Sequence, residues 1–224
     1  MNIRNKRVYK INSVEKIKEK LFFWGNLFQP IVWLDSNHYP HQQMEYDAIL
    51  AVGLASNEKF VCSSDKLNLK INKDWLFGYF SYEKKSKWNH IQQTKKLPFN
   101  CHDLCFFIPQ KIWLLKSNKL TALYFSDDNS EDDFNSILNQ KNVFKDLKIS
   151  NGIINSRITK SEYLNNASKI KNHILRGDIY EVNYCFEYYA EDVNLNSSNL
   201  FYKLNKLTKS PFSAYFNICL LYTS

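Results

Sequence analysis

Glycine is scarce in this sequence, with only five among 224 residues. The two closest pairs, Gly53 with Gly78 and Gly152 with Gly177, are each 25 positions apart. Dinucleotide-binding fingerprints and P-loops need glycines a few residues apart, so both are excluded within this chain. No apolar run reaches the roughly 18 residues that indicate a membrane span. The basic N-terminus lacks a following apolar segment, so we expect neither a signal peptide nor a membrane segment.

Cysteine and arginine are also few. The five cysteines are an odd number and do not indicate a disulfide framework. A metal site in residues 101–105 is not favoured, because a second ligand pair at zinc-finger spacing is lacking. Only four of the 30 basic residues are arginine, and the lysines are spread among 22 acidic residues. We therefore interpret the net charge of +8 as a solvated surface rather than a nucleic-acid interface. We expect reduced thiols and a cytoplasmic protein.

The composition, 44% hydrophobic and 16% aromatic, is typical of a globular protein. Ser13 is placed to cap a first helix, and Thr159 and Glu162 form a capping box before a later one. Apolar spacing predicts helices over 14–24, 133–139, 160–176 and from Ser198, and strands over 30–34, 46–52, 59–62, 74–82, 111–116, 119–126, 180–188 and 213–221. Antiparallel hairpins mixed with flanking helices indicate the α+β class. The polar stretch 148–157 indicates a subdomain boundary.

Residue types and spacing alone give little indication of a catalytic site. The five histidines accompany no serine or cysteine nucleophile in a recognisable setting, and no metalloprotease motif is present. Asp178 and Glu181 flank a predicted strand and could act as acid and base. A capping or solvated role is favoured for both. Composition and spacing therefore stop at an α+β domain of unassigned activity.

Several short motifs resemble those of one enzyme family. Residues 177–183 (Gly-Asp-Ile-Tyr-Glu-Val-Asn) resemble its Gly-Asp-x-x-Gln-Val-Asn signature, with Glu181 in place of glutamine. Residues 209–215 (Lys-Ser-Pro-Phe-Ser-Ala-Tyr) are similar to its next landmark, with Pro-Phe-Ser instead of the Pro-Tyr-Met of anthranilate synthases. Further similar elements are the aromatic strand 75–83, the Phe-Ile-Pro of 107–109, the Trp-Leu-Asp-Ser of 33–36 and the Tyr-Asp of 46–47. Together they resemble component I of the chorismate-utilising enzymes, most closely aminodeoxychorismate synthase.

The resemblance implies an anthranilate synthase component I-like fold, a partial two-sheet antiparallel β-sandwich with flanking helices that is C-terminally truncated. It divides the chain into an N-terminal region (1–150), the start of a chorismate-binding domain (157–218) and a tail, interpreted as non-native (219–224). The family's Ser-Pro-Glu-Arg and Pro-Ile-Lys-Gly-Thr elements, acidic magnesium ligands and catalytic histidine find no counterpart here. We therefore expect no catalytic residue, no metal ligand and no activity in this chain.

The resemblance also implies the reaction of the intact enzyme. Chorismate and ammonia from a glutamine amidotransferase subunit would give 4-amino-4-deoxychorismate, for p-aminobenzoate and folate biosynthesis. Mg²⁺ would orient a carboxylate of chorismate, and an acid would protonate the departing hydroxyl. Alternatives are component I of anthranilate synthase, in tryptophan biosynthesis, and a non-catalytic amino-acid-binding module. An RNA-binding protein is a third alternative, although no RRM signature is visible.

Finally, the resemblance implies a pocket for tryptophan as an effector or bound ligand. Its expected residues are Ser36, Gln43, Met44, Glu45, Tyr46, Pro211, Phe212 and Ser213. An amino acid needs polar partners for its ammonium and carboxylate and an apolar slot for its side chain. Ser36 and Glu45 would supply the polar end and the others the walls, with the Ser36 hydroxyl pointing inward. Without the resemblance, Ser36 would be a turn residue, and Met44 and Phe212 would be core packing.

Overall fold

A computed structural model describes residues 4–39, 45–55, 60–62, 74–81, 102, 104–125, 129–141, 153–191 and 193–218. The chain divides into two compact units. The first combines Met1–Phe144 with Phe201–Ser224, and the second is Lys145–Leu200. The proposed domain division at 1–150, 157–218 and 219–224 stays a prediction.

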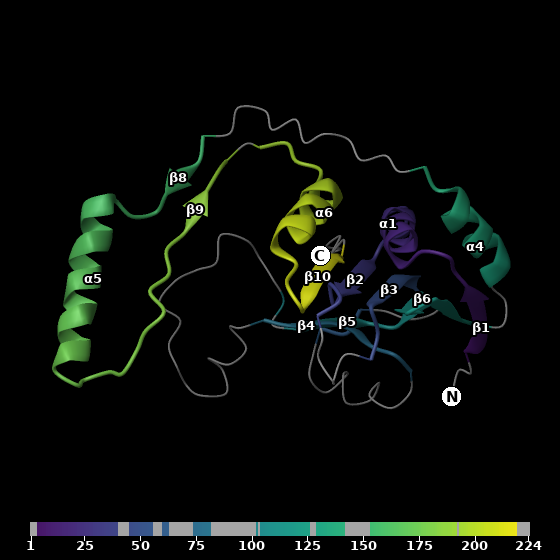
Figure 1. Cartoon of the computed structure of the whole chain (residues 1–224), viewed down its shortest axis with the longest axis horizontal. Helices are drawn as coiled ribbons and strands as arrows, with labels where there is room; N and C mark the ends of the chain where they lie inside the picture. Colours follow the sequence, from purple (N-terminus) through teal and green to yellow (C-terminus); the bar gives the residue numbers. More distant parts are fainter. Residues whose placement is uncertain are drawn as a thin grey trace. The chain divides into compact units, whose positions relative to one another are not determined.

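The first unit is built on a six-stranded sheet in the order β1-β7-β6-β3-β2-β10, in which all neighbours are antiparallel (Figure 1). The strands are β1 (Asn5–Lys10), β2 (Ile31–Asp35), β3 (Ala48–Leu54), β6 (Pro109–Lys116), β7 (Lys119–Tyr124) and β10 (Ser213–Asn217). The predicted hairpin across Ser117 and Asn118 is confirmed as β6 and β7. The C-terminal strand of this sheet, β10, pairs with β2, which lies far earlier in the sequence.

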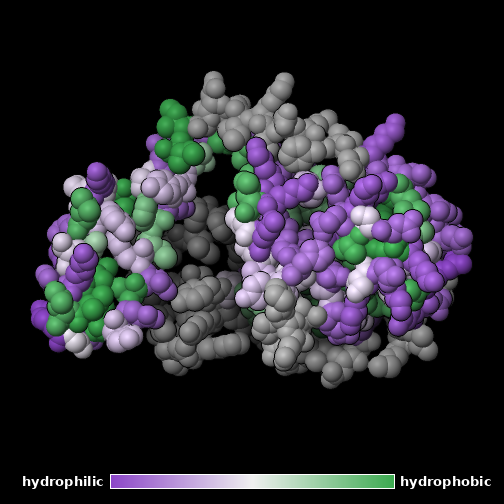
Figure 2. All heavy atoms as spheres, in the orientation of Figure 1, coloured by the Kyte–Doolittle hydropathy of each residue, from purple (hydrophilic) through white to green (hydrophobic). Residues whose placement is uncertain are grey.

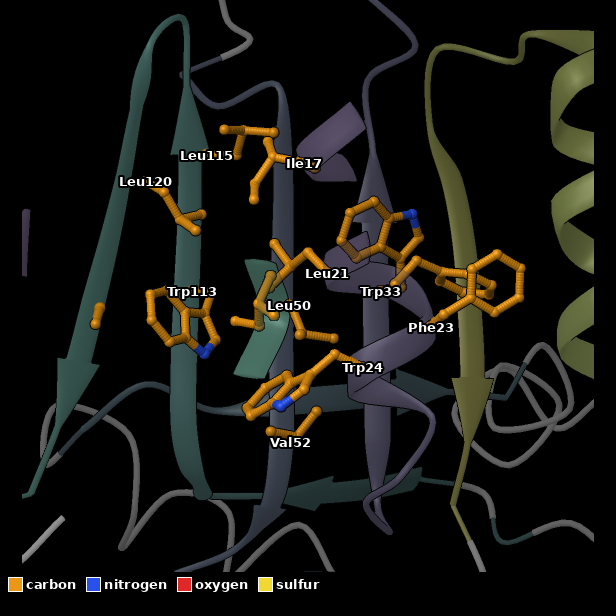
Figure 3. Close-up of a cluster of buried hydrophobic side chains, with 14 of the residues drawn as sticks. Ile17, Leu21, Phe23, Trp24, Trp33, Leu50, Val52, Trp113, Leu115 and Leu120 are labelled. Carbon is orange, nitrogen blue, oxygen red and sulfur yellow. The ribbon is translucent and has the colours of Figure 1, made fainter. Parts of the chain in front are cut away.

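Helix α1 (Val14–Gly25) covers one face of this sheet. The Ser13 side chain accepts from Lys16 N, as the sequence predicts. Figure 3 shows Ile17, Leu21 and Trp24 of α1, Leu50 of β3, and Trp113 of β6 in one hydrophobic cluster. Each of these five side chains is at most 3% exposed. A second helix, α4 (Ser130–Asn139), begins three residues before the prediction because Asn129 caps it, and it contacts α1.

The opposite face of the sheet carries a two-stranded sheet of β4 (Phe77–Phe80) and β5 (Leu104–Phe107). Phe77 and Phe107 pack there with Val32, Ala51 and Ile112 of the large sheet. A glycine inside a predicted strand indicates close approach of another backbone, and this is confirmed at Gly78. A Cβ at this position would lie 2.0 Å from the carbonyl oxygen of Cys105, so only glycine fits. The predicted strand 59–62 reduces, among its described residues, to one bridge between Val61 and Phe106.

The second unit contains β8 (Asn155–Ser156), α5 (Lys160–Leu175) and β9 (Tyr188–Tyr189). The capping box of Thr159 and Glu162 is confirmed. Tyr163 of α5 stacks on Tyr184, with ring centroids 5.3 Å apart. No residue of α5 is fully buried, and Figure 2 shows hydrophobic groups on the surface of this unit.

The predicted strand over 180–188 is wrong for most of its length. Residues 181–187 form no strand, and only Tyr188–Tyr189 pairs, with Asn155–Ser156. Alternating apolar residues give an apolar face, but a strand also needs a partner for its backbone N–H and C=O groups. Tyr180 and Val182, placed on that face, are 93% and 48% exposed.

Apolar spacing in helix α6 (Ser197–Thr208) predicts an inward stripe of Leu200, Phe201, Leu204 and Leu207, and this prediction is only partly correct. Phe201 packs on Phe22 of α1 in the first unit, with ring centroids 5.5 Å apart. Leu204 and Leu207 are 54% and 75% exposed, so their inward placement is wrong. The α+β class is confirmed, whereas the anthranilate synthase-like sandwich stays a prediction.

Candidate functional site

Three chain segments meet where β2 ends. In the antiparallel pair of β2 and β10, Ser213 lies opposite Asp35. In the pair of β2 and β3, Asp35 lies opposite Ala48. The end of β2, the start of β3 and the start of β10 are therefore neighbours, and the residues that flank these strands share one edge of the sheet. Sheet register thus brings together segments about 175 positions apart in the sequence.

A cavity of about 330 Å³ lies at this edge. Its lining residues are Leu34, Asp35, Ser36, Glu45, Tyr46, Ala48, Ile49, Pro211, Phe212 and Ser213. The structure therefore places six of the eight expected pocket residues around one space. The other two, Gln43 and Met44, lie outside the described residues. The volume falls at the lower end of the range of about 300–1,000 Å³ that is usual for small-ligand sites.

Ser36 lies at the cavity in a fixed orientation. Its backbone N–H and its hydroxyl both donate to the carbonyl oxygen of Asp47, at 3.1 and 3.0 Å. The hydroxyl proton is therefore used within the protein, and the free lone pair of Oγ can accept a hydrogen bond. An ammonium group suits this oxygen better than a carboxylate does.

Glu45 and Tyr46 form the β3 side of the cavity. The Tyr46 hydroxyl donates to the Glu45 carboxylate. Burial raises the pKa of Tyr46, and the hydrogen bond to the carboxylate raises it further. Both effects favour the protonated phenol beside the Glu45 carboxylate. A second carboxylate, that of Asp47, accepts a hydrogen bond from Ser117 N at 2.6 Å and holds the residue that precedes β3 in place.

Pro211 and Phe212 form the wall that precedes β10. Phe212 is 78% exposed, which excludes the alternative that it is a core residue. The Asn37 side chain donates to Ser210 O at 2.7 Å and ties this segment to the end of β2. An exposed phenylalanine beside a cavity is available to pack against a ligand.

A buried ion pair involves Asp35, one of the residues that line the cavity. Lys18 Nζ is 2.7 Å from Asp35 Oδ1, and the two side chains are 8% and 7% exposed. The same Asp35 oxygen accepts from Asn37 N at 2.8 Å. Asn205 of α6 donates to Asp35 Oδ2 at 3.4 Å and accepts from the Asn37 side chain at 2.8 Å. These contacts hold α1, β2 and the C-terminal part of α6 together around Asp35.

The sequence reasoning missed Lys18 and Asn205. A signal for Lys18 existed, because it lies four residues after Val14 and three before Leu21, at helical core spacing. A lysine at such a position needs a buried acidic partner. Nothing in the spacing identifies that partner as Asp35, which is 17 positions away.

The second unit does not bring Asp178 and Glu181 together as an acid–base pair. The Asp178 carboxylate accepts from Arg176 Nη2 at 2.7 Å and lies 2.7 Å from His173 Nδ1. All three side chains are at least 44% exposed. Asp178 therefore belongs to a solvated ion-pair cluster after α5, in line with the favoured reading of its sequence position.

Among the described residues, no three histidine, cysteine, aspartate or glutamate side chains lie close enough together to hold a metal ion. None of the helices in the same residues has the length and apolarity to cross a membrane.

Comparison with known protein families gives one match. The family model of the chorismate binding enzymes matches residues 32–219. Because this match covers most of the sequence, the chain belongs to the chorismate binding enzyme family. A search of curated proteins found no match.

Proposed function

We propose that this chain corresponds to the N-terminal half of component I of an aminodeoxychorismate synthase. The family match and the Pro-Phe-Ser of residues 211–213 support this assignment. In the intact enzyme, ammonia from a glutaminase subunit would replace the ring hydroxyl of chorismate, with Mg²⁺ holding a substrate carboxylate. We further propose a cytoplasmic location and no turnover by these 224 residues alone, since the family's catalytic lysine motif is absent from them.

We propose in addition that the 330 Å³ cavity at the end of β2 binds L-tryptophan. The observation that carries this proposal is the convergence of Ser36, Glu45 and Phe212 on one space. Each comes from a different segment, and the family resemblance assigns all three to one pocket. Chance placement would scatter them over the surface.

The chemistry of the lining suits a zwitterionic aromatic ligand. The Glu45 carboxylate and Ser36 Oγ can accept from the ammonium group of the amino acid. The hydroxyl of Ser213 is the other hydroxyl in the lining besides those of Ser36 and Tyr46, and we assign it as a donor to the ligand carboxylate. Pro211 and Phe212 flank the slot for the indole ring.

Calorimetric titration of the whole chain with L-tryptophan and with indole tests this proposal. L-tryptophan should bind and indole should bind at least tenfold more weakly, because indole lacks both charged groups. Glu45→Gln should weaken L-tryptophan at least tenfold, whereas Glu191→Gln, at an exposed position in the second unit, should not. Equal affinity for indole, or an unaffected Glu45→Gln, would contradict the assigned polar end.

The rate of ligand exchange distinguishes the two enzyme assignments. A tryptophan that remains bound through purification and exchanges slowly with labelled tryptophan favours aminodeoxychorismate synthase. Rapid exchange, as a feedback inhibitor requires, favours anthranilate synthase component I.

A further inference from the structure

Two cysteines lie opposite each other in the smaller sheet of the first unit. Val61 and Phe106 form an antiparallel bridge. Moving one residue along each chain from this bridge places Cys62 opposite Cys105. Packing supports the same register, because Phe60 and Phe107, opposite each other on the other side of the bridge, have ring centroids 5.8 Å apart.

The hydrogen bonds of the Val61–Phe106 bridge determine whether Cys62 and Cys105 form a hydrogen-bonded or a non-hydrogen-bonded pair. Val61 N donates to Phe106 O at 2.8 Å, and Phe106 N donates to Val61 O at 3.0 Å. This exchange makes the bridge a hydrogen-bonded pair, so Cys62 and Cys105 occupy the neighbouring non-hydrogen-bonded position. There the Cα atoms are about 4.5 Å apart, at the short end of the range of about 4.4–6.8 Å seen for disulfides. The two thiols are also within hydrogen-bonding range of each other.

We propose that Cys62 and Cys105 are a redox-sensitive pair that forms a cross-strand disulfide when the protein meets a low-molecular-weight disulfide such as oxidised glutathione. Both thiols are free in the structure. This inference is independent of the proposed tryptophan site.

The two cysteines have different parts in the reaction. Cys62 is exposed and Cys105 is buried, so Cys62 meets the oxidant first. The Cys62 thiolate attacks one sulfur of the small disulfide, which forms a mixed disulfide and releases one glutathione thiol. The Cys105 thiolate then attacks the Cys62 sulfur and releases the second glutathione thiol. Two protein thiols lose two electrons and their protons, and one glutathione disulfide gains them.

The second step should be slow at neutral pH. Burial raises the pKa of Cys105 to about 12, and the neighbouring Cys62 contributes to the shift. Only a small fraction of Cys105 is then thiolate at pH 7. As long as the pH stays below the pKa, this fraction increases tenfold for each unit by which the pH is raised. The rate of ring closure should therefore increase about tenfold from pH 7 to pH 8, once the mixed disulfide has formed.

A Cys62–Cys105 disulfide would restrain the smaller sheet of the first unit. Cys105 lies in β5, which pairs with β4 on one side, where Tyr79 is opposite Cys105, and with Val61 on the other, through Phe106. The disulfide would join the Phe60–Cys62 segment covalently to β5 and enclose residues 63–104 in a loop. Closing a loop in the unfolded chain stabilises the folded state.

The test is oxidation of the whole chain with oxidised glutathione, followed by non-reducing peptide mapping. We expect a Cys62–Cys105 linkage, a mass loss of about 2 Da that dithiothreitol reverses, and a thermal midpoint several degrees higher in the oxidised form. The triple variant Cys101→Ser, Cys185→Ser, Cys219→Ser keeps only the proposed pair and should behave in the same way. The matched Cys62→Ser variant should give no linkage and no rise in the midpoint.

Three outcomes would overturn the proposal. The first is a map in which Cys62 pairs with Cys101 or Cys185. The second is a stable glutathione adduct on Cys62 that does not resolve between pH 7 and pH 9. The third is retention of both thiols in the triple variant. Mapping of the unmodified chain keeps the test decisive if the variants fold poorly.

Discussion

Replacing Lys18 with methionine should strongly destabilise the first unit. The change keeps the length of the side chain and removes the cation that lies 2.7 Å from Asp35, where both side chains are less than 9% exposed. The remaining donors to Asp35, Asn37 N and the Asn205 amide, are neutral. Loss of one partner from a buried ion pair costs about 3–5 kcal/mol, because the other charge stays buried. That is a large part of a typical folding free energy of about 5–15 kcal/mol.

Urea unfolding measures this effect, and two variants control for it. Lys16→Met makes the same change at an exposed position of the same helix and should alter the unfolding free energy by less than about 0.5 kcal/mol. The double variant Lys18→Met with Asp35→Leu removes both charges and should recover most of the loss. If Lys18→Met cost no more than Lys16→Met, the buried pair would not exist in solution and the account of the contacts around Asp35 would be refuted.

Four further predictions concern other parts of the chain. Gly78→Ala should destabilise the first unit by about 1–3 kcal/mol or more, because its Cβ would meet Cys105 O at 2.0 Å. Urea unfolding measures this loss. Gly177→Ala, whose added Cβ would have no atom within 4 Å, tests the effect of backbone conformation alone. Thr159→Ala should cost about 1 kcal/mol of α5 stability through loss of the cap, as measured by circular dichroism. The pKa of Glu162 is lowered by hydrogen bonds from Thr159, so this stabilisation is present above the unfolded pKa of about 4.5, and helicity should fall as the pH drops through the lower folded value. The 224-residue chain should form no aminodeoxychorismate from chorismate and ammonia, and any turnover seen by chromatography would contradict the proposed lack of activity in these residues.

Local signals in the sequence predicted local structure well. Ser13 before an apolar stripe located α1, and the Thr159–Glu162 box located α5. Both depend on contacts within a few residues, which spacing shows directly. The strand over 180–188 failed for the opposite reason, because a strand depends on a partner that the segment itself does not contain.

The candidate site depends on long-range pairing, which spacing does not show. Nothing near Ser36 in the sequence indicates that Phe212 lies beside it, and only the family resemblance joined them. The β2–β10 register supplies the physical reason, by setting Ser213 opposite Asp35. Lys18 shows the same limit, since its position was visible as a helix-core lysine but its partner was not.

The most direct test of the central claim is the affinity of L-tryptophan for Phe212→Ala compared with Phe80→Ala. Both phenylalanines are more than half exposed, but only Phe212 lines the cavity, while Phe80 packs on Phe106. The account predicts that Phe212→Ala weakens binding at least tenfold, or about 1.4 kcal/mol, and that Phe80→Ala changes it less than twofold. Equal affinities for the two variants would show that tryptophan does not bind in this cavity.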